Sequence, residues 1–266
     1  MALDLIRKCR DHSKKLVRFN VDYIRGGFER HREAKARGTL RIPADEVSRK
    51  ARCCFVLSTG RCGTGLLTRI LCASKHLWPL HQPSPELAFA SAQAYQQLDE
   101  DPRIIRSAAL SARFDLVWQS YVRGRMLVET NNRITYFCPA LSGIFARSKF
   151  IHLVRHPGDF ARSALRRAFY DDESVDDGLL EPRHDDAVRQ RWDSMNRIEK
   201  VGWLWNEIQG FAERFKQSVN GDRTLTVRSE DLYSQVETAR SIFHFLEVDS
   251  PVPDHRLARL LSHPVN

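Results

Sequence analysis

The hydrophobic positions of the chain follow two patterns, short and nearly continuous apolar runs and longer segments with helical spacing. The short runs are typical of strands buried in a parallel sheet, and they predict strands over residues 52–58, 126–129, 149–154 and 224–227. Helical spacing predicts helices over about 63–73, 85–98, 104–123, 136–146, 157–169, 185–219 and 231–246. Strands that alternate with helices favour an α/β fold, with a doubly wound and mostly parallel sheet flanked by helices.

Three polar segments follow these strands directly. Residues 58–65 come after the first strand, Arg155 follows the third and Arg228 follows the fourth. The carboxyl ends of parallel strands lie at one edge of a sheet, and the ligands of such folds bind beyond that edge. We therefore expect these three segments to meet at one rim.

The charge of the chain is uneven. Residues 1–50 contain 14 Lys and Arg against 7 Asp and Glu, whereas the rest contains 28 against 26, which argues against nucleic acid as a partner. Apolar residues at helical spacing among lysines and arginines predict a basic amphipathic helix over 3–24, followed by a connector. We predict two parts, this helix with its connector over 1–50 and an α/β domain over 51–266. The helix either packs on that domain or makes a peripheral contact with an anionic membrane.

Six cysteines are spread over the chain, at positions 9, 53, 54, 62, 72 and 138, and no pair has C-x-x-C spacing. This pattern argues against a disulfide framework and against a zinc site, so we expect no metal. No apolar run approaches the ~20 residues of a membrane span, and the N-terminus lacks the apolar core of a signal peptide. These features favour a cytoplasmic protein, peripheral to a membrane if the basic helix binds one.

The segment "FVLSTGRCGTGLLTRIL", residues 55–71, joins a predicted strand to a predicted helix through a glycine-rich turn. Gly60 and Gly65 have the separation found in the triphosphate loop G-x-x-x-x-G-K-[ST]. Leu66 and Leu67 replace its lysine and its hydroxyl residue, so an ordinary ATP or GTP site with magnesium is not expected. The turn still suits an anion, because backbone N–H groups at the start of a helix attract negative charge.

Polar side chains strengthen this interpretation in two places. In the turn, Arg61 adds a positive charge and Thr64 a hydroxyl donor, which suits a donor nucleotide that needs no metal. The other interpretation is a turn without a ligand. In "FIHLVRHPGDFARSALRR", residues 150–167, Arg155 follows a buried strand and Ser163 lies on the next helix. An arginine fork and a hydroxyl from two elements suit one phosphate, although each residue alone is also explained as an ordinary surface residue.

Together these segments resemble a known family, the sulfotransferases that use PAPS, 3′-phosphoadenosine 5′-phosphosulfate. "RCGTG" at 61–65 is similar to the family's loop for the 5′ end, and "LVRHPGDFARS" is similar to its 3′-phosphate motif. "TVRSEDLYSQVETARSIFHFLEV" resembles a later strand and helix of the family, and "MLVETNNR" resembles the stretch before the 3′ motif. The resemblance covers about residues 51–248 in the correct order, and it implies a P-loop-like sulfotransferase architecture.

The resemblance also implies roles for individual residues. Arg61 would stabilise charge on the bridging oxygen as the sulfate departs, and Arg155 and Ser163 would hold the 3′-phosphate. The 5′ end of the donor would lie in the loop formed by Cys62, Gly63, Thr64 and Gly65.

The chain departs from the family pattern at several positions. Cys62 and Gly65 replace the family's usual Ser and Thr, and Ser229 replaces the Tyr of "YEDL" near the adenine. The C-terminal "RKGxxGDWK" segment of the cytosolic small-molecule enzymes is missing from the sequence, so we expect another segment to cover the adenosine.

A base must take the proton of the acceptor in such a transfer. Many members of the family carry a histidine in "KTH", but the corresponding stretch here is "ETNN", with Asn131 in its place. Other branches use a glutamate after the first helix, so Glu86 in "HLWPLHQPSPELAFA" is our first candidate, ahead of His81 and Glu129. Glu86 is equally explained as a first-turn acid of a helix that starts at Pro85, and His81 as an ordinary structural or solvated histidine.

The predicted function is transfer of a sulfuryl group from PAPS to a hydroxyl or amine of a small-molecule, carbohydrate or lipid acceptor, by in-line displacement. The acidic stretch "YDDESVDDGLLEPRHDD", residues 170–186, is either a solvated loop or a lid that favours a cationic acceptor. Two other functions stay open, an atypical P-loop kinase and a nucleotide-binding module without catalysis.

Overall fold

The computed structural model describes residues 42–98, 101–171, 178–248 and 252–262. The chain divides into two units, 1–44 and 45–266, and the fold described below is that of the second. The predicted basic helix over 3–24 lies outside the described residues. The predicted connector ends in a short helix instead, α2 (Ala44–Lys50), which has acids in its first turn and basic residues in its last.

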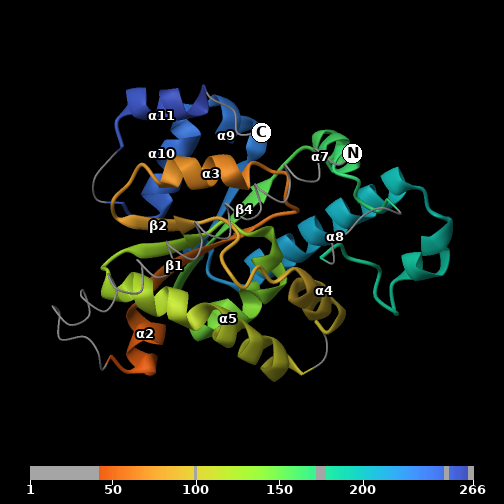
Figure 1. Ribbon diagram of the computed structural model, residues 1–266, viewed down its shortest axis with the longest axis horizontal. Helices are drawn as coiled ribbons and strands as arrows, with labels where there is room; N and C mark the ends of the chain where they lie inside the picture. The colour runs from red at the N-terminus through yellow and green to blue at the C-terminus, as the bar shows by residue number, and fades with distance from the viewer. Residues whose placement is uncertain (1–41, 99–100, 172–177, 249–251, 263–266) are drawn as a thin grey trace, which may run out of the picture. The chain divides into compact units, whose positions relative to one another are not determined.

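Five parallel strands form the sheet, in the order β2-β3-β1-β4-β5 (Figure 1). They are β1 (Arg52–Leu57), β2 (Leu77–Leu80), β3 (Met126–Glu129), β4 (Arg147–Val154) and β5 (Thr224–Arg228). The predicted α/β class with a parallel sheet is therefore confirmed. Strand β2 was missing from the prediction because its second half contains Pro79, which lacks a backbone donor; an edge strand tolerates this residue.

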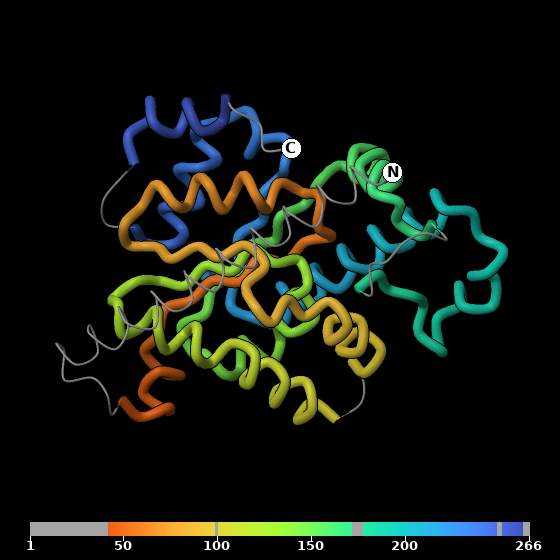
Figure 2. The backbone as a smooth tube through the Cα atoms, in the orientation of Figure 1, coloured from red at the N-terminus to blue at the C-terminus, as the bar shows by residue number. Residues whose placement is uncertain are grey.

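Side chains alternate between the two faces of the sheet, and each face is covered by helices. Cys54 and Val56 of β1 belong to a core with α3 (Thr64–Leu71), α9 (Ser229–Ser234), α10 (Val236–Phe245) and α11 (Asp254–Leu261). Figure 2 shows these helices together on one side of the strands. Burial of about fifteen Val, Leu and Ile side chains in this layer, at roughly 1.5–3 kcal/mol each, is the main contribution to its stability.

The opposite face is covered by α4 (Ala88–Gln96), α5 (Pro102–Val122), η1 (Asn132–Phe137), α6 (Cys138–Ile144) and α8 (Arg197–Ser218). Aromatic rings dominate this layer. Phe150 of β4 lies 6.1 Å from Phe55 of β1 and 4.8 Å from Phe215 of α8, measured between ring centroids. The helix α7 (Pro157–Arg166) follows β4 at the rim and packs on α8. Helices on both faces make the sheet doubly wound, as predicted.

Several predicted helices have different bounds in the structure; the one predicted over 231–246, for example, is divided into α9 and α10. The helix predicted over 185–219 is divided into η2 (Ala187–Ser194) and α8. The break is a capping box, in which Asn196 Oδ1 accepts from the Glu199 backbone N–H at 3.1 Å while the Glu199 carboxylate accepts from the Asn196 N–H at 2.8 Å. Helix α4 starts at Ala88 rather than near Pro85, so Glu86 precedes the helix.

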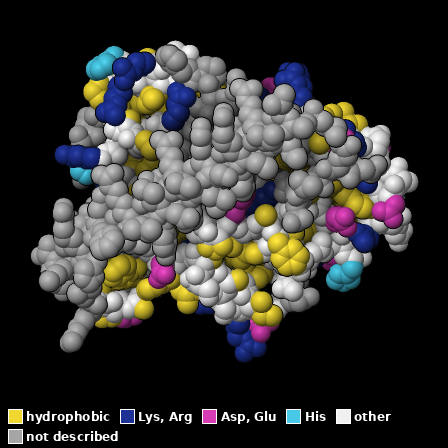
Figure 3. Space-filling model, viewed as in Figure 1, with side chains coloured by type: hydrophobic (Ala, Val, Ile, Leu, Met, Phe, Trp, Pro, Cys, Tyr) yellow, Lys and Arg dark blue, Asp and Glu magenta, His cyan; other side chains and the backbone are white. Residues whose placement is uncertain are grey.

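The surface carries charges of both signs. On the face in Figure 3, basic and acidic side chains lie at several separate places, and hydrophobic side chains gather over α4 and α5. The large hydrophobic residues exposed on these two helices are Phe89, Ile104 and Leu110. Within the described ranges, no helix has the length and apolarity needed to span a bilayer.

Candidate functional site

The turn after β1 has an unusual backbone conformation. Gly60, Arg61 and Gly63 have φ angles of 73°, 57° and 89°, all in the left-handed region. Glycine adopts this region freely, whereas Arg61 occupies it at a cost of about 1–3 kcal/mol. A Cβ atom at Gly63 would lie 3.1 Å from the ring of Tyr233. Both this contact and the left-handed φ angle therefore oppose a side chain at this position. Left-handed residues in such a turn can bring N–H groups together in a concavity, which is how a backbone binds phosphate.

Side chains beneath the turn hold its shape. The Cys62 side chain is fully buried, and its Sγ lies 3.0 Å from Thr59 Oγ1 and 3.1 Å from the Gly60 carbonyl. Burial raises the pKa of the Cys62 thiol to about 11, so the neutral thiol packs inside the loop. Ser229, at the start of α9, donates from Oγ to the Cys62 carbonyl at 2.6 Å. Because the Cys62 side chain is buried, only the backbone of this residue is in a position to contact a ligand at the rim.

The two predicted anion-binding segments meet directly. Arg61 donates from Nε to Ser163 Oγ of α7 at 3.1 Å, and Arg155 donates from Nη1 to the Arg61 carbonyl at 2.7 Å. Arg155 follows β4, the neighbour of β1, and α7 begins two residues later. The strand order thus brings into direct contact residues that are separated by 94 and 102 positions in the sequence.

Positive charge accumulates around Arg61. Partial burial lowers the pKa of the Arg61 guanidinium, and the nearby charges of Arg167 and Arg155 lower it further. Three guanidinium groups of the same sign repel one another, so an anion bound among them would relieve the repulsion. The electrostatics at this rim therefore favour a highly charged anionic ligand.

Two aromatic residues support these segments, and neither role was predicted. Trp205 of α8 donates from its indole Nε1 to the Arg155 carbonyl at 3.0 Å. Tyr233 lies four residues after Ser229 on α9, and its ring lies against Gly63. Helical spacing puts residues i and i+4 on one face, so "SEDLY" could have indicated that both would contact the loop. Trp203 of the same helix α8 is buried in the core instead.

His81 follows β2 at the rim and is exposed. Its Nδ1 lies 3.1 Å from both the carbonyl oxygen and Oγ1 of Thr130. A carbonyl only accepts, so this contact places the proton on Nδ1 and leaves Nε2 of a neutral ring as an acceptor. Thr130 Oγ1 in turn lies 2.6 Å from Thr68 Oγ1, and Thr68 donates to the Thr64 carbonyl at 2.8 Å.

The two glutamate candidates differ in accessibility. Glu86 is exposed in the segment before α4, where its side chain has no hydrogen-bond or ion-pair partner among the described residues. Glu129, at the end of β3, is fully buried and makes a bidentate ion pair with Arg113, with N···O distances of 2.6 and 2.8 Å. Burial raises the pKa of Glu129, and the Arg113 guanidinium opposes that shift. Glu129 is therefore closed off from solvent in this structure, whereas Glu86 is open to it.

The acidic stretch is paired where the structure describes it. Asp171 forms an ion pair with Arg197 of α8 at 2.7 Å, and Asp186 accepts from the Trp203 indole at 3.1 Å. Positions 172–177, which include three of the aspartates of the predicted lid, lie outside the described residues. Asp171 and Asp186 thus fasten this stretch to α8.

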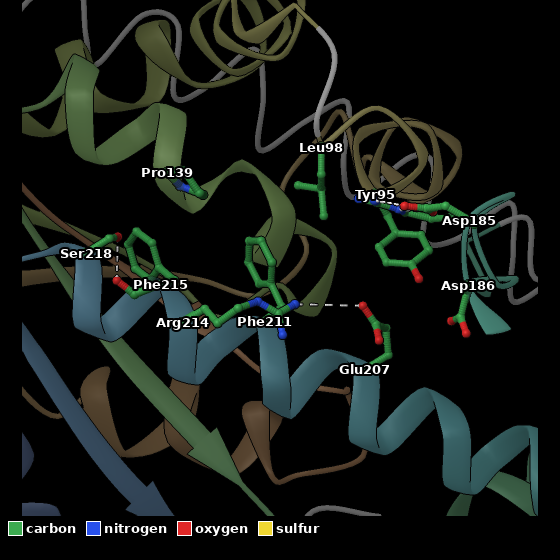
Figure 4. A pocket seen from close by; sticks show the side chains of 11 residues that line it. Tyr95, Leu98, Pro139, Asp185, Asp186, Glu207, Phe211, Arg214, Phe215 and Ser218 are labelled. Atoms are coloured by element: carbon green, nitrogen blue, oxygen red, sulfur yellow. Dashed lines mark hydrogen bonds and ion pairs between the residues drawn. The ribbon is translucent and has the colours of Figure 1, made fainter. Parts of the chain in front are cut away.

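A groove of about 570 Å³ lies beside α8, apart from all of the predicted site residues. Tyr95 and Leu98 line one side of it, and α8 side chains from Glu207 to Ser218 line the other (Figure 4). Glu207 and Arg214 face each other in the groove at 4.0 Å, and burial raises the pKa of the Glu207 carboxyl. The size suits a small ligand, but the chemistry predicted for the rim is absent from its lining.

The fold and the rim define an α/β protein in which a glycine-rich loop of left-handed conformation contacts a second basic segment beside it. A family model described as "Sulfotransferase family" matches residues 54–253. Because this match spans most of the chain, the chain belongs to the sulfotransferase family, as the motif resemblance predicted.

Solved structures agree with this family. The chain is similar to the sulfotransferase domain from the curacin biosynthetic pathway, with 19% identity, coverage of 78% of this chain and 77% of that one, and a TM-score of 0.51. It is also similar to a sulfotransferase from Alicyclobacillus acidocaldarius, with 16% identity, coverage of 80% and 85%, and a TM-score of 0.50. These similarities show the fold, and they confirm the predicted sulfotransferase architecture. No curated protein matches the chain.

Proposed function

We propose that this protein transfers a sulfuryl group from PAPS to a hydroxyl or amine of a small-molecule, carbohydrate or lipid acceptor. The observation that carries the proposal is the 3.1 Å hydrogen bond between Arg61 Nε and Ser163 Oγ. It joins the loop that resembles the family's 5′ motif to the helix that resembles its 3′ motif. One nucleotide with phosphates at both positions can therefore reach both segments.

The residues at the rim fit such a donor. PAPS supplies, when bound, a sulfuryl group on a good leaving group. The left-handed loop at Gly63, with Thr64 and Gly65 at the start of α3, would hold the 5′ end through backbone N–H groups. Arg155 and Ser163 would hold the 3′-phosphate, and Arg61, which contacts both residues, would stabilise the charge that develops on the bridging oxygen.

The acceptor must lose a proton as its oxygen or nitrogen attacks sulfur and the bond from sulfur to the bridging oxygen breaks. We assign Glu86 as the base, because it is the exposed carboxylate after the first helix, and His81 as the alternative, because its Nε2 is left as an acceptor. The exposed ring of Phe89, one turn beyond Glu86 and 65% accessible, offers an apolar contact for the acceptor.

Binding of the product nucleotide tests the proposal first. Adenosine 3′,5′-bisphosphate should raise the melting temperature of the protein in EDTA, and ATP with magnesium should raise it less. The variant Arg155→Ala with Ser163→Ala should lose this response, whereas Arg240→Ala, at a surface pair on α10, should keep it. If ATP raised the melting temperature as much as the bisphosphate does, and did so only when magnesium was present, the result would favour a kinase instead.

Transfer is then measured with ³⁵S-labelled PAPS and a panel of phenols, alkyl alcohols, amines, saccharides and glycolipids. Labelled product from one class, and its loss in Arg61→Ala, is the expected result. A protein that binds the bisphosphate tightly but labels no member of the panel would refute catalysis on these acceptor classes and favour a binding module.

A further inference from the structure

A buried charged network lies beneath the segment that carries Glu86. Arg113 of α5, Glu129 of β3 and Asn131 after β3 are all fully buried. Arg113 binds both carboxylate oxygens of Glu129, at 2.6 and 2.8 Å, and Asn131 Nδ2 lies 3.2 Å from one of them. The three side chains thus form one connected unit between a helix and the end of a strand.

The network ends on the backbone of the Glu86 segment. Arg113 donates from Nη2 to the Pro85 carbonyl at 3.0 Å, and Asn131 donates from Nδ2 to the Glu86 carbonyl at 2.9 Å. Two consecutive carbonyls are therefore bound by buried donors, one of them in the residue assigned as the base. The segment itself is irregular, with Gln82 and Leu87 at φ angles of 49° and 69°.

The composition of the network is informative because it costs free energy. A buried ion pair is often no more stabilising than apolar side chains of the same volume. Apolar side chains, however, cannot donate to a carbonyl, so they would leave the backbone at Pro85 and Glu86 without these partners. The charged pair therefore has a role that an apolar core could not fill, because Arg113 donates a hydrogen bond to the backbone of the exposed segment at Pro85.

We propose that Arg113, Glu129 and Asn131 are positioning residues that hold the backbone of Glu86, so that its carboxylate is presented at the rim. The inference rests on the proposed function, in which Glu86 is the base. It also gives a role to Asn131, which stands where the resembling family has a histidine. Asn131 does not act as a base itself; its amide donates to the Glu86 carbonyl and so holds the backbone of the proposed base.

The test uses two variants and one matched control. Arg113→Met combined with Glu129→Leu removes both charges together, so that neither is left buried without its partner. Asn131→Ser keeps an oxygen that can accept from the Arg133 N–H, now held by Asn131 Oδ1 at 3.0 Å, but removes the amide donor. The control is Arg240→Met with Asp254→Leu, another Arg–carboxylate pair, which joins α10 to α11 on the other face of the sheet.

The first measurement needs neither donor nor acceptor. A protease specific for glutamate cuts after Glu86 only when the surrounding segment opens, and mass spectrometry follows that fragment. Cleavage at this bond should become about tenfold faster in both network variants and stay at the parent rate in the control. Unchanged cleavage in both network variants would overturn the inference. If the paired variant does not fold, Asn131→Ser decides the matter by the same criterion.

The second measurement uses the acceptor that the labelled panel identifies. The network variants should lose about 100-fold in kcat, with the KM for PAPS and the Kd of adenosine 3′,5′-bisphosphate unchanged. Adding Glu86→Gln to either network variant should cause little further loss, because both changes disable one group. If the loss in kcat from Glu86→Gln and the loss from the network variant multiplied in full, the inference would be overturned. A parent protein that fails to bind the bisphosphate would refute the proposed function, while the cleavage result would still decide the positioning role.

Discussion

The two sides of the rim are built in opposite ways. On the proposed donor side, a left-handed loop would bind the 5′ end through backbone N–H groups, and the arginines around the loop are partly exposed. On the other side, the proposed base Glu86 is a single exposed side chain, and its segment is supported by a buried network of Arg113, Glu129 and Asn131. A backbone site needs specific residues close together in sequence, whereas a supported side chain needs partners that only the fold brings together.

This difference explains why one side carries a recognisable motif and the other does not. The turn at 60–65 depends on glycines at fixed spacing, which the sequence displays directly. The contact of Arg113 with Glu129 crosses from α5 to β3, and that of Asn131 with Glu86 spans 45 positions. The comparison predicts that substitutions on the two sides affect different kinetic constants.

The largest effect is expected on the Glu86 side. Glu86→Gln should reduce kcat by about 10²–10⁴-fold, because the acceptor loses its base, while the KM for PAPS stays unchanged. His81→Asn, at the other candidate, should reduce kcat by less than Glu86→Gln does. Steady-state kinetics with the identified acceptor measure both variants. The opposite ranking would move the base to His81 and leave the donor side intact.

Arg61→Ala should have the next largest effect, about 10²–10³-fold in kcat, because a charged donor beside the departing oxygen is removed. The Kd of adenosine 3′,5′-bisphosphate should change much less, since Arg155 and the loop backbone remain. Arg61→Lys should restore part of the rate. Calorimetric titration together with kcat separates the two effects; a collapse of binding in Arg61→Ala would show that Arg61 holds the loop rather than the transition state.

Gly63→Ala should act on the donor side through shape. The left-handed φ of 89° and the Tyr233 ring at 3.1 Å both oppose a side chain, at a cost of about 1–3 kcal/mol. The expected result is a bisphosphate Kd raised by about 5- to 100-fold, converted from that cost at 1.4 kcal/mol per tenfold. Gly63→Ala combined with Tyr233→Leu should recover only the part due to the ring. Gly221→Ala, with open space around its Cβ, is the control.

The smallest effect is expected for Asp171→Asn. Its ion pair with Arg197 is more than a third exposed on both sides, and such pairs contribute about 0–1 kcal/mol to the free energy of unfolding. Urea denaturation should therefore show a small shift in the midpoint, with bisphosphate binding unchanged. A large loss of stability would mean that the acidic stretch is fastened to α8 more firmly than this pair accounts for.

Much of the fold could be predicted because its signals are local. The buried strands β1, β3, β4 and β5 are continuous apolar runs, and the amphipathic helices repeat at 3.6 residues. Strand β2 could not be predicted, because "LWPL" is four residues long and contains a proline that only its edge position permits. The division of the predicted 185–219 helix had a signal, the N-x-x-E capping box at Asn196, which helical periodicity obscured.

The site was predictable to the same extent. Arg61, Arg155 and Ser163 could be grouped in advance because parallel strands end at one rim, and the structure brings these three together. The burial of Glu129 could not be foreseen, because its partner Arg113 lies on a helix whose orientation the sequence leaves open. An isolated glutamate at a strand end looks the same whether it faces a ligand or an arginine.

The central position of β1 has a consequence for the binding of the two substrates. The turn after β1 contacts α7, which follows β4, through the hydrogen bond between Arg61 and Ser163. On the other side, α3 contacts the residue after β3 through the 2.6 Å contact between Thr68 and Thr130. Whatever stiffens the turn is therefore transmitted to both neighbouring strand ends. Under the proposed function, a nucleotide bound on the β4 side should therefore raise the affinity for the acceptor, and by reciprocity the acceptor should raise the affinity for the nucleotide by the same factor.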